Sequence, residues 1–315
     1  MKSIVTGCAG FIGSHLSERL LDMGHEVMGI DCFTDYYSRT QKEENISEIM
    51  DHEGFNFFEK DIIDPDLESI VGGVDYVFHQ AAQAGVRYSW GNSFDTYTRN
   101  NILATQRLLE ACRTTGIKKF IYASSSSVYG DVENLPMKET DMPQPVSPYG
   151  VSKLAAEHLC YLYHKNFSVP TVSLRYFTVY GPRQRPDMAF NKFIKAILMD
   201  REIEVYGDGN QTRDYTFISD AVEANIRAMD AGSGVFNIGG GSRKTLNEVI
   251  ETFEDLMDKK AVINYTGKQK GDVAHTYADT SRAQEILGYS PKINLRNGLK
   301  EEVEWLKKQV QTTFM

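Results

Sequence analysis

Three glycines near the N-terminus constrain the fold of this chain most strongly. Gly7, Gly10 and Gly13 follow a short apolar segment, Ser3–Thr6, and precede a helical pattern over Phe11–Met23. A strand, a glycine turn and a helix in this order bring the backbone close to a pyrophosphate at the helix N-terminus. Without that context the spacing would also fit a tight turn. With it, we expect a dinucleotide site that includes Gly7, Gly10, Phe11, Ile12 and Gly13.

Short apolar runs then alternate with helical patterns, which is typical of βαβ units around a parallel sheet. Further strands are expected at Glu26–Asp31, Phe55–Glu59, Tyr76–Gln80, Lys119–Ser124 and Val169–Phe177, and long helices at Tyr97–Thr115 and Ser147–Lys165. After Gly181-Pro182 the elements become shorter. We therefore expect an α/β protein with a Rossmann-type doubly wound parallel sheet and a smaller α/β C-terminal substrate-binding domain. Residues 1–177 and about 219–240 would form the cofactor domain, and residues 178–218 and 241–315 the cap.

The composition argues against several classes of function. The 315 residues carry a net charge of −9, which disfavours a nucleic-acid partner. No apolar stretch reaches the ~18 residues of a membrane span, and the first residues run directly into a strand rather than a leader. The four cysteines lie far apart, which indicates neither disulfides nor a metal site. We expect a cytoplasmic protein that binds no nucleic acid, membrane or metal.

Residues at the ends of the expected strands fit contacts to the cofactor. Asp31 ends the second strand, where a carboxylate binds the adenosine ribose and repels a 2′-phosphate, so NAD is expected rather than NADP. Asp61 and Ile62 would lie near the adenine, although a plain loop role fits Asp61 nearly as well. His79 is expected to be a hydrogen-bonded strand-end histidine rather than a catalytic base. The small residues after it allow a close approach of the cofactor to Gln80, Ala81 and Ala82.

Tyr149 and Lys153 are the candidate proton-transfer pair. They lie four residues apart on a helix that Ser147-Pro148 is expected to begin, so they share one face. The lysine charge would favour the phenolate and lower the pKa of Tyr149 from about 10 toward neutrality. An amphipathic helix with a snorkelling lysine has the same spacing. A serine from the run Ser124–Ser127 could hydrogen-bond the same substrate oxygen, which indicates alcohol–ketone chemistry.

In this order the motifs resemble the extended short-chain dehydrogenase/reductase family, specifically its nucleotide-sugar epimerases and dehydratases. The resemblance covers essentially the whole chain and includes segments 125–130, 149–153, 175–182, 205–209, 213–215 and 271–273. It implies that Tyr149 accepts the sugar hydroxyl proton, that Ser125 is its hydroxyl partner and that Lys153 binds the nicotinamide ribose. Further cofactor contacts are implied for Asn101, Ser124, Tyr149, Lys153 and Tyr176.

The resemblance also implies a substrate site for a UDP-sugar. Arg213 would pair with the diphosphate, because a planar fork suits phosphate geometry, and Asp272 would contact the nucleoside ribose. The uracil would pack against Val205 and Tyr206. Dehydratases of the family carry an acidic pair where this chain has Ser126 and Ser127, so the resemblance favours a redox-neutral 4-epimerase that works through a transient 4-keto sugar.

Segments 84–88, with Arg87, and 183–189 are closest to UDP-glucuronate 4-epimerases, and Thr178 stands where the uronate enzymes have threonine. The resemblance therefore implies conversion of UDP-glucuronate to UDP-galacturonate. Arg185, Thr178 and Ser126 are our candidates for holding the substrate carboxylate, which a 4-keto uronate otherwise loses readily as CO₂. A diphosphate clamp or a solvated loop is the alternative for Arg185.

Three other functions stay open. The small Thr276 would admit a 2-acetamido group, which keeps a UDP-N-acetylglucosamine or UDP-glucose 4-epimerase as the main alternative. A UDP-glucuronate decarboxylase and a non-catalytic NAD-binding protein are the others. The two long helices resemble the four-helix interface of the family, so a homodimer is expected.

Overall fold

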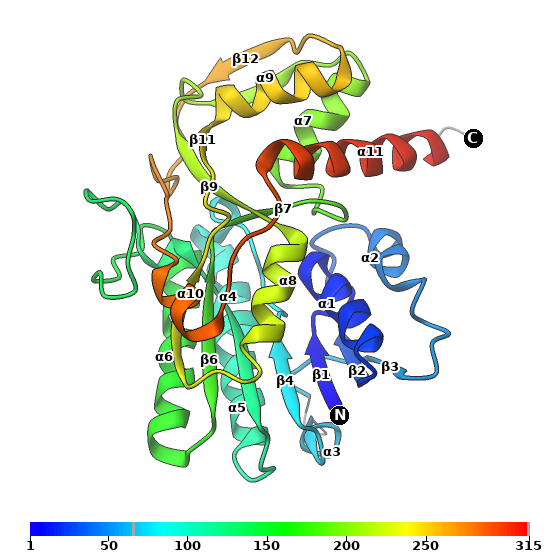
Figure 1. Cartoon of the computed structure of the whole chain (residues 1–315), viewed down its shortest axis with the longest axis vertical. Coiled ribbons are helices and arrows are strands. Elements are labelled where there is room, and N and C mark those ends of the chain that lie inside the picture. The colour runs from blue at the N-terminus through cyan, green and yellow to red at the C-terminus, as the bar shows by residue number, and fades with distance from the viewer. Residues whose placement is uncertain (65–66, 314–315) are drawn as a thin grey trace.

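Seven parallel strands form the central sheet of the computed structural model (Figure 1). In chain order they are β1 (Lys2–Thr6), β2 (Glu26–Asp31), β3 (Phe55–Glu59), β4 (Tyr76–His79), β5 (Lys119–Ser125), β6 (Thr171–Tyr176) and β10 (Gly234–Ile238). Their order in space is β10-β6-β5-β4-β1-β2-β3. The order reverses between β1 and β4, which opens a crevice at their carboxyl ends. The expected doubly wound Rossmann-type fold is confirmed.

The structure describes residues 1–64 and 67–313, so the last two residues of the expected cap lie outside the described part. Helices cover both faces of the sheet (Figure 1). α1 (Phe11–Asp22) and α8 (Ile218–Arg227) pack together on one face, while α3 (Leu67–Val71), α5 (Ala104–Cys112) and α6 (Pro148–Phe167) cover the other. In β1, Val5 therefore joins the core on the α1 side and Ile4 joins the core on the α5 side.

A smaller α/β cap stands above the carboxyl ends of the strands (Figure 1). One of its sheets contains β7 (Thr178–Tyr180), β9 (Thr212–Phe217) and β11 (Arg243–Thr245), and the other contains β8 (Ile203–Tyr206) and β12 (Ile263–Thr266). Its helices α7 (Ala189–Leu198), α9 (Leu246–Met257) and α11 (Leu295–Thr313) pack on one another. The rings of Phe190 and Phe253 meet at 5.3 Å in an apolar core that continues into the main sheet.

The helix predicted at Tyr97–Thr115 is present, but it begins at Phe94, ends at Cys112 and is interrupted by a wider turn. It consists of a short α4 (Phe94–Tyr97), a π-helical segment over Thr98–Leu103 and then α5. The wider π turn directs Asn101 into the interior, where its Nδ2 donates to the Gln83 carbonyl (3.0 Å) and to Ser152 Oγ (2.9 Å), and its Oδ1 accepts from the Gln83 N–H (2.7 Å). These buried bonds stabilise a turn that a 3.6-residue period does not reveal.

The start of α6 agrees with its sequence signal. Ser147 is extended and its hydroxyl accepts from the Gly150 N–H at 3.1 Å, while Pro148 occupies the first turn. The helices α2 (Arg39–Ile46) and α10 (Ser281–Leu287) were not expected from the sequence. In the described part of the chain, no helix is both long enough and apolar enough to cross a bilayer.

Candidate active site

A groove at the carboxyl ends of the central strands contains the glycine turn. Gly7 has a φ of +69°, and a Cβ there would lie 2.8 Å from the Ala81 nitrogen. A Cβ on Gly13 would lie 2.0 Å from the Gly7 carbonyl oxygen, so the first turn of α1 packs directly on the loop before it. No side chain of α1 caps this end of the helix, which leaves backbone N–H groups for an anion. The turn has the form that a pyrophosphate requires.

Most of the predicted cofactor residues line this groove. They are Gly7, Gly10, Phe11, Ile12, Gly13, Asp31, Asp61, Ile62, Gln80, Ala81, Ala82, Ser124, Tyr149, Lys153 and Tyr176. Asn101 does not line it, because its side chain holds the Gln83 backbone behind the groove; its neighbour Asn100 does. The Asp31 carboxylate accepts from the Phe33 N–H at 2.9 Å and from the Ala9 N–H at 3.2 Å. Burial raises the pKa of Asp31, although these bonds and Lys42 oppose the increase.

The residues that the sequence analysis missed come mainly from the irregular segment after β2. Thr34, Tyr36 and Tyr37 line the groove, as does Lys42 from α2. Lys42 is buried, donates to the Thr34 carbonyl oxygen and lies 4.8 Å from the Tyr37 ring centre. Two carboxylates, three lysines that include Lys60, small backbone-exposing residues and aromatic rings suit a dinucleotide with a diphosphate and flat bases. The groove therefore fits NAD.

Tyr149 and Lys153 of α6 both line the groove. The Lys153 ammonium donates to the Ala123 carbonyl at 2.9 Å, and burial lowers the pKa of Lys153 to about 7. Burial raises the pKa of Tyr149, while a hydrogen bond with Ser125 and the charge of Arg185 act in the opposite direction. The expected lowering of the Tyr149 pKa by Lys153 is not seen, because burial raises that pKa and the Lys153 ammonium is directed to a carbonyl.

His79 is held by hydrogen bonds at the end of β4. Its ring nitrogens lie 2.8 Å from Thr6 Oγ1 and 2.9 Å from Thr105 Oγ1, both buried. Burial lowers its pKa to about 3, with a smaller contribution from the Lys153 charge. The imidazole is therefore neutral and fully hydrogen-bonded, as expected from the sequence.

A buried ion pair supports the end of β5 where the candidate serines begin. Arg175 in β6 binds Glu157 in α6 through Nε (3.0 Å) and Nη2 (2.5 Å). Glu157 also accepts from the Ser124 hydroxyl at 2.7 Å. The side chains of Arg175 and Glu157 are only 4% and 6% exposed. One carboxylate thus joins β5, β6 and α6 immediately behind Ser125.

Most of the residues predicted to bind the nucleotide of the substrate meet where the cap lies against the segment after β4. Arg87 Nη2 donates to Asp272 Oδ2 at 2.6 Å, and the Arg87 guanidinium lies 4.1 Å from the Tyr206 ring centre. Arg213 donates to the carbonyls of Val273 (2.7 Å) and Ala274 (3.1 Å), next to Asp272. The side chain of Val205, by contrast, is fully buried in the apolar core.

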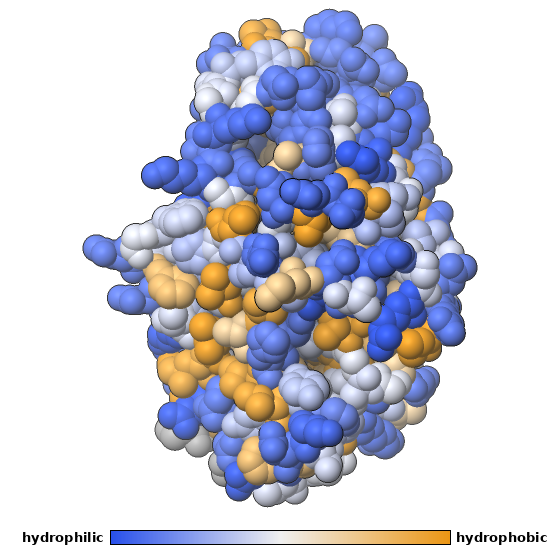
Figure 2. All heavy atoms as spheres, turned by 90° about the vertical axis from the view of Figure 1, so that its left-hand side faces the viewer, coloured by the Kyte–Doolittle hydropathy of each residue, from blue (hydrophilic) through white to orange (hydrophobic). Residues whose placement is uncertain are grey.

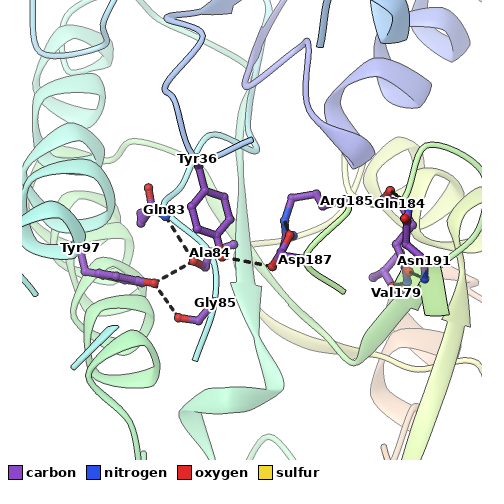
Figure 3. A network of polar contacts seen from close by, with 10 residues as sticks. All are labelled: Tyr36, Gln83, Ala84, Gly85, Tyr97, Val179, Gln184, Arg185, Asp187 and Asn191. Atoms are coloured by element: carbon purple, nitrogen blue, oxygen red, sulfur yellow. Dashed lines mark hydrogen bonds and ion pairs between the residues drawn. The ribbon is translucent and has the colours of Figure 1, made fainter. Parts of the chain in front are cut away.

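The three candidates for the substrate carboxylate come from different elements. Ser125 and Tyr176 are register partners at the ends of β5 and β6, so Ser126 and Thr178 follow neighbouring strand ends. Arg185 lies on the loop after β7, lines the same groove as Tyr149 and forms a two-bond ion pair with Asp187 (Figure 3).

Thr276 is buried, and its hydroxyl accepts from the Asp214 N–H at 3.3 Å, so its side chain is part of the packed cap.

A glycine turn for a dinucleotide, with a tyrosine and a lysine from one helix turn and a serine from the adjacent strand end, defines a short-chain dehydrogenase/reductase site. A family model described as GDP-mannose 4,6 dehydratase matches residues 4–302. The chain belongs to this family of extended short-chain dehydrogenases/reductases.

Several relatives are similar over the whole chain. YtcB of Bacillus subtilis, described as an uncharacterized UDP-glucose epimerase, is 44% identical over 99% of each chain. The UDP-glucuronate 4-epimerase of Thermodesulfobacterium geofontis is 39% identical over 98% of this chain and 97% of its own. The crystal structure of UDP-glucuronic acid 4-epimerase from Bacillus cereus, in complex with UDP-glucuronic acid and NAD, is 44% identical, covers 98% of this chain and 100% of that one, and has a TM-score of 0.96.

Proposed function

We propose that this protein is an NAD-dependent UDP-sugar 4-epimerase that interconverts UDP-glucuronate and UDP-galacturonate. One observation supports the choice of substrate above all. Arg185 lines the groove beside Tyr149, and its charge is close enough to act on the pKa of that phenol. A guanidinium at this place gives a sugar carboxylate a partner next to the reacting carbon. Similarity to the two uronate epimerases supports the same choice.

The chain supplies the proton transfer and the positioning in this reaction. Tyr149 accepts the C4 hydroxyl proton, and Ser125 hydrogen-bonds to the same oxygen. When bound, NAD supplies the reversible removal and return of hydrogen at C4. Lys153 and Asp31 hold the two riboses of the cofactor, and the turn from Gly7 to Gly13 holds its pyrophosphate. Ser126 and Ser127 replace the acidic pair of a dehydratase, so no side chain there supports loss of water.

The cap holds the nucleotide in this proposal. Arg87 and Asp272 form one polar pair at the uridine, with the Tyr206 ring stacked on Arg87. Arg213, which its bonds to the Val273 and Ala274 carbonyls place beside Asp272, would bind the diphosphate. Residues 1–177 with about 219–240 bind NAD, and residues 178–218 with 241–315 bind the UDP-sugar.

The four cysteines lie in described residues and are unpaired, which supports a cytoplasmic location.

Incubation with UDP-glucuronate, UDP-glucose and UDP-N-acetylglucosamine separately, followed by NMR of the products, tests the proposal. We expect the uronate to be converted fastest. In Arg185→Ala, kcat/KM should fall about 10- to 100-fold for UDP-glucuronate, because a charge-assisted hydrogen bond is lost, and much less for UDP-glucose. Equal losses on both sugars would show that Arg185 contacts no carboxylate. Preferential conversion of a neutral sugar would favour the alternative epimerases, and UDP-pentose with CO₂ as the main product would favour a decarboxylase.

We also propose that the protein is a homodimer through the face of α6. On that helix Val151, Tyr161 and Leu162 are 45%, 61% and 48% exposed, and Leu103 before the adjoining α5 is 40% exposed. Figure 2 views the side of the molecule on which α6 lies. Apolar side chains gather over the lower half of that molecular face. A second copy of this face would bury them in a four-helix arrangement.

Light scattering after size exclusion is expected to give twice the 35.6 kDa mass of one chain. Leu162→Glu should give a monomer, because a charge would be placed on the apolar face. As a control, Glu26→Gln on an exposed position of β2 should stay dimeric. A wild-type mass of one chain would exclude the dimer.

A further inference from the structure

The guanidinium of Arg185 is held by a carboxylate from its own loop. Arg185 Nε donates to Asp187 Oδ1 at 2.9 Å, and Nη2 donates to Asp187 Oδ2 at 3.0 Å (Figure 3). This parallel pair of bonds fixes the plane of the guanidinium as well as its position. Arg185 lines the groove while Asp187 does not, so the carboxylate approaches from behind. Among the described residues, Arg185 Nη1 has no hydrogen-bond partner, which leaves that end for a ligand.

The loop that carries both residues is itself anchored on either side. Arg183, immediately before, donates to Glu18 on α1 at 2.6 Å. Gln184 accepts from the side chain of Asn191 through its carbonyl oxygen (2.8 Å) and from the Asn191 N–H through Oε1 (3.1 Å), as Figure 3 shows for this pair. The backbone around Arg185 is therefore fixed, and the remaining freedom is in the long Arg185 side chain, which Asp187 restrains through two bonds.

Tyr36 restrains Asp187 in turn. Its hydroxyl donates to Asp187 Oδ2 at 3.1 Å, and its ring centre lies 5.9 Å from the Arg185 guanidinium (Figure 3). Tyr36 belongs to the segment after β2 that lines the cofactor groove. Burial raises the pKa of Tyr36 to about 12, so its hydroxyl remains a donor at neutral pH. The chain Tyr36–Asp187–Arg185 thus joins the cofactor-binding segment to the sugar site.

We propose that Asp187, held by Tyr36, is a positioning residue that keeps Arg185 oriented so that the substrate carboxylate cannot turn into the geometry that loses CO₂. This inference rests on the proposed uronate substrate. In the 4-keto uronate, the C5–C6 bond breaks when it lines up with the π orbitals of the C4 carbonyl. Its electron pair forms the C4–C5 enolate, CO₂ departs, and C5 then takes up a proton. A guanidinium fixed in one plane holds the carboxylate out of that alignment.

The test is the ratio of CO₂ to UDP-galacturonate formed from UDP-glucuronate labelled at C6. In Asp187→Asn this ratio should rise about tenfold or more, because the negative charge that holds the Arg185 guanidinium in place is lost. KM should change by less than about threefold, since Arg185 keeps its charge and its free Nη1 end. Tyr36→Phe should raise the ratio in the same direction but by less. A merely structural defect lowers both products together and leaves their ratio unchanged.

Two matched variants serve as controls. Asp35→Asn removes an exposed carboxylate from the same segment as Tyr36, and Tyr88→Phe removes the hydroxyl of a ring whose centre lies 6.0 Å from that of Tyr36. Both should keep the wild-type ratio. If the wild type converts UDP-glucuronate and Asp187→Asn leaves the ratio unchanged, the positioning role is excluded while the proposed function stands. If the wild type does not convert UDP-glucuronate, the proposed function fails, and the positioning role fails with it.

Discussion

Replacing Tyr149 with phenylalanine is expected to lower kcat about 10²- to 10⁴-fold, while NAD and UDP-sugar still bind. Tyr149 is half-buried and lines the groove, where its oxygen is hydrogen-bonded with Ser125. Phenylalanine preserves the ring and its edge contact with Tyr97, whose centre is 6.2 Å away. Only the proton acceptor is removed, so the loss should appear in kcat rather than in binding.

Single-turnover kinetics and calorimetric titration with UDP-sugar separate the two effects. Tyr265→Phe is the matched control, because it makes the same change on β12, at a side chain that is 51% exposed. We expect it to be as active as the wild type. Turnover by Tyr149→Phe at the wild-type rate would show that another group accepts the proton.

The features that could be predicted from sequence are those with a local signature. The boundaries of β2 and β3 match the expected strands Glu26–Asp31 and Phe55–Glu59, and the turn from Gly7 to Gly13 follows from the steric requirement for a residue without a side chain. The parallel arrangement follows from the alternation of strands and helices. These signals depend only on residues close in the chain.

The features that could not be predicted depend on contacts between distant segments. The apolar residues around Tyr36 show no helical or strand spacing. Tyr36 reaches the groove because the segment after β2 contacts the loop after β7 through its bond to Asp187. The π-helical turn likewise depends on bonds from Asn101 to Gln83 and Ser152. The spacing of Tyr149 and Lys153 predicts a shared face, but not that Lys153 donates to Ala123. Pairwise spacing therefore locates the catalytic groups, whereas their protonation depends on what surrounds them.

The second large effect is expected on stability, from the buried pair of Arg175 and Glu157 behind Ser125, the serine proposed to be catalytic. Glu157→Gln should lower the free energy of unfolding by about 3–5 kcal/mol, because it leaves the Arg175 charge buried without a counter-ion. Burial excludes the water that would otherwise solvate it, since both side chains are less than one-tenth exposed. The ring of Tyr129, 4.7 Å from the Arg175 guanidinium, compensates only in part.

Urea unfolding at fixed protein and NAD concentrations measures this loss. Glu26→Gln makes the same substitution in an exposed pair with Lys2, where the change should be below about 1 kcal/mol. Equal effects of the two substitutions would show that Arg175 is compensated elsewhere. Replacing both members of the buried pair, Glu157→Leu with Arg175→Met, should recover most of the stability because no charge remains buried. It should not recover full activity, since Ser124 would still lack the acceptor that holds the end of β5 beside Ser125.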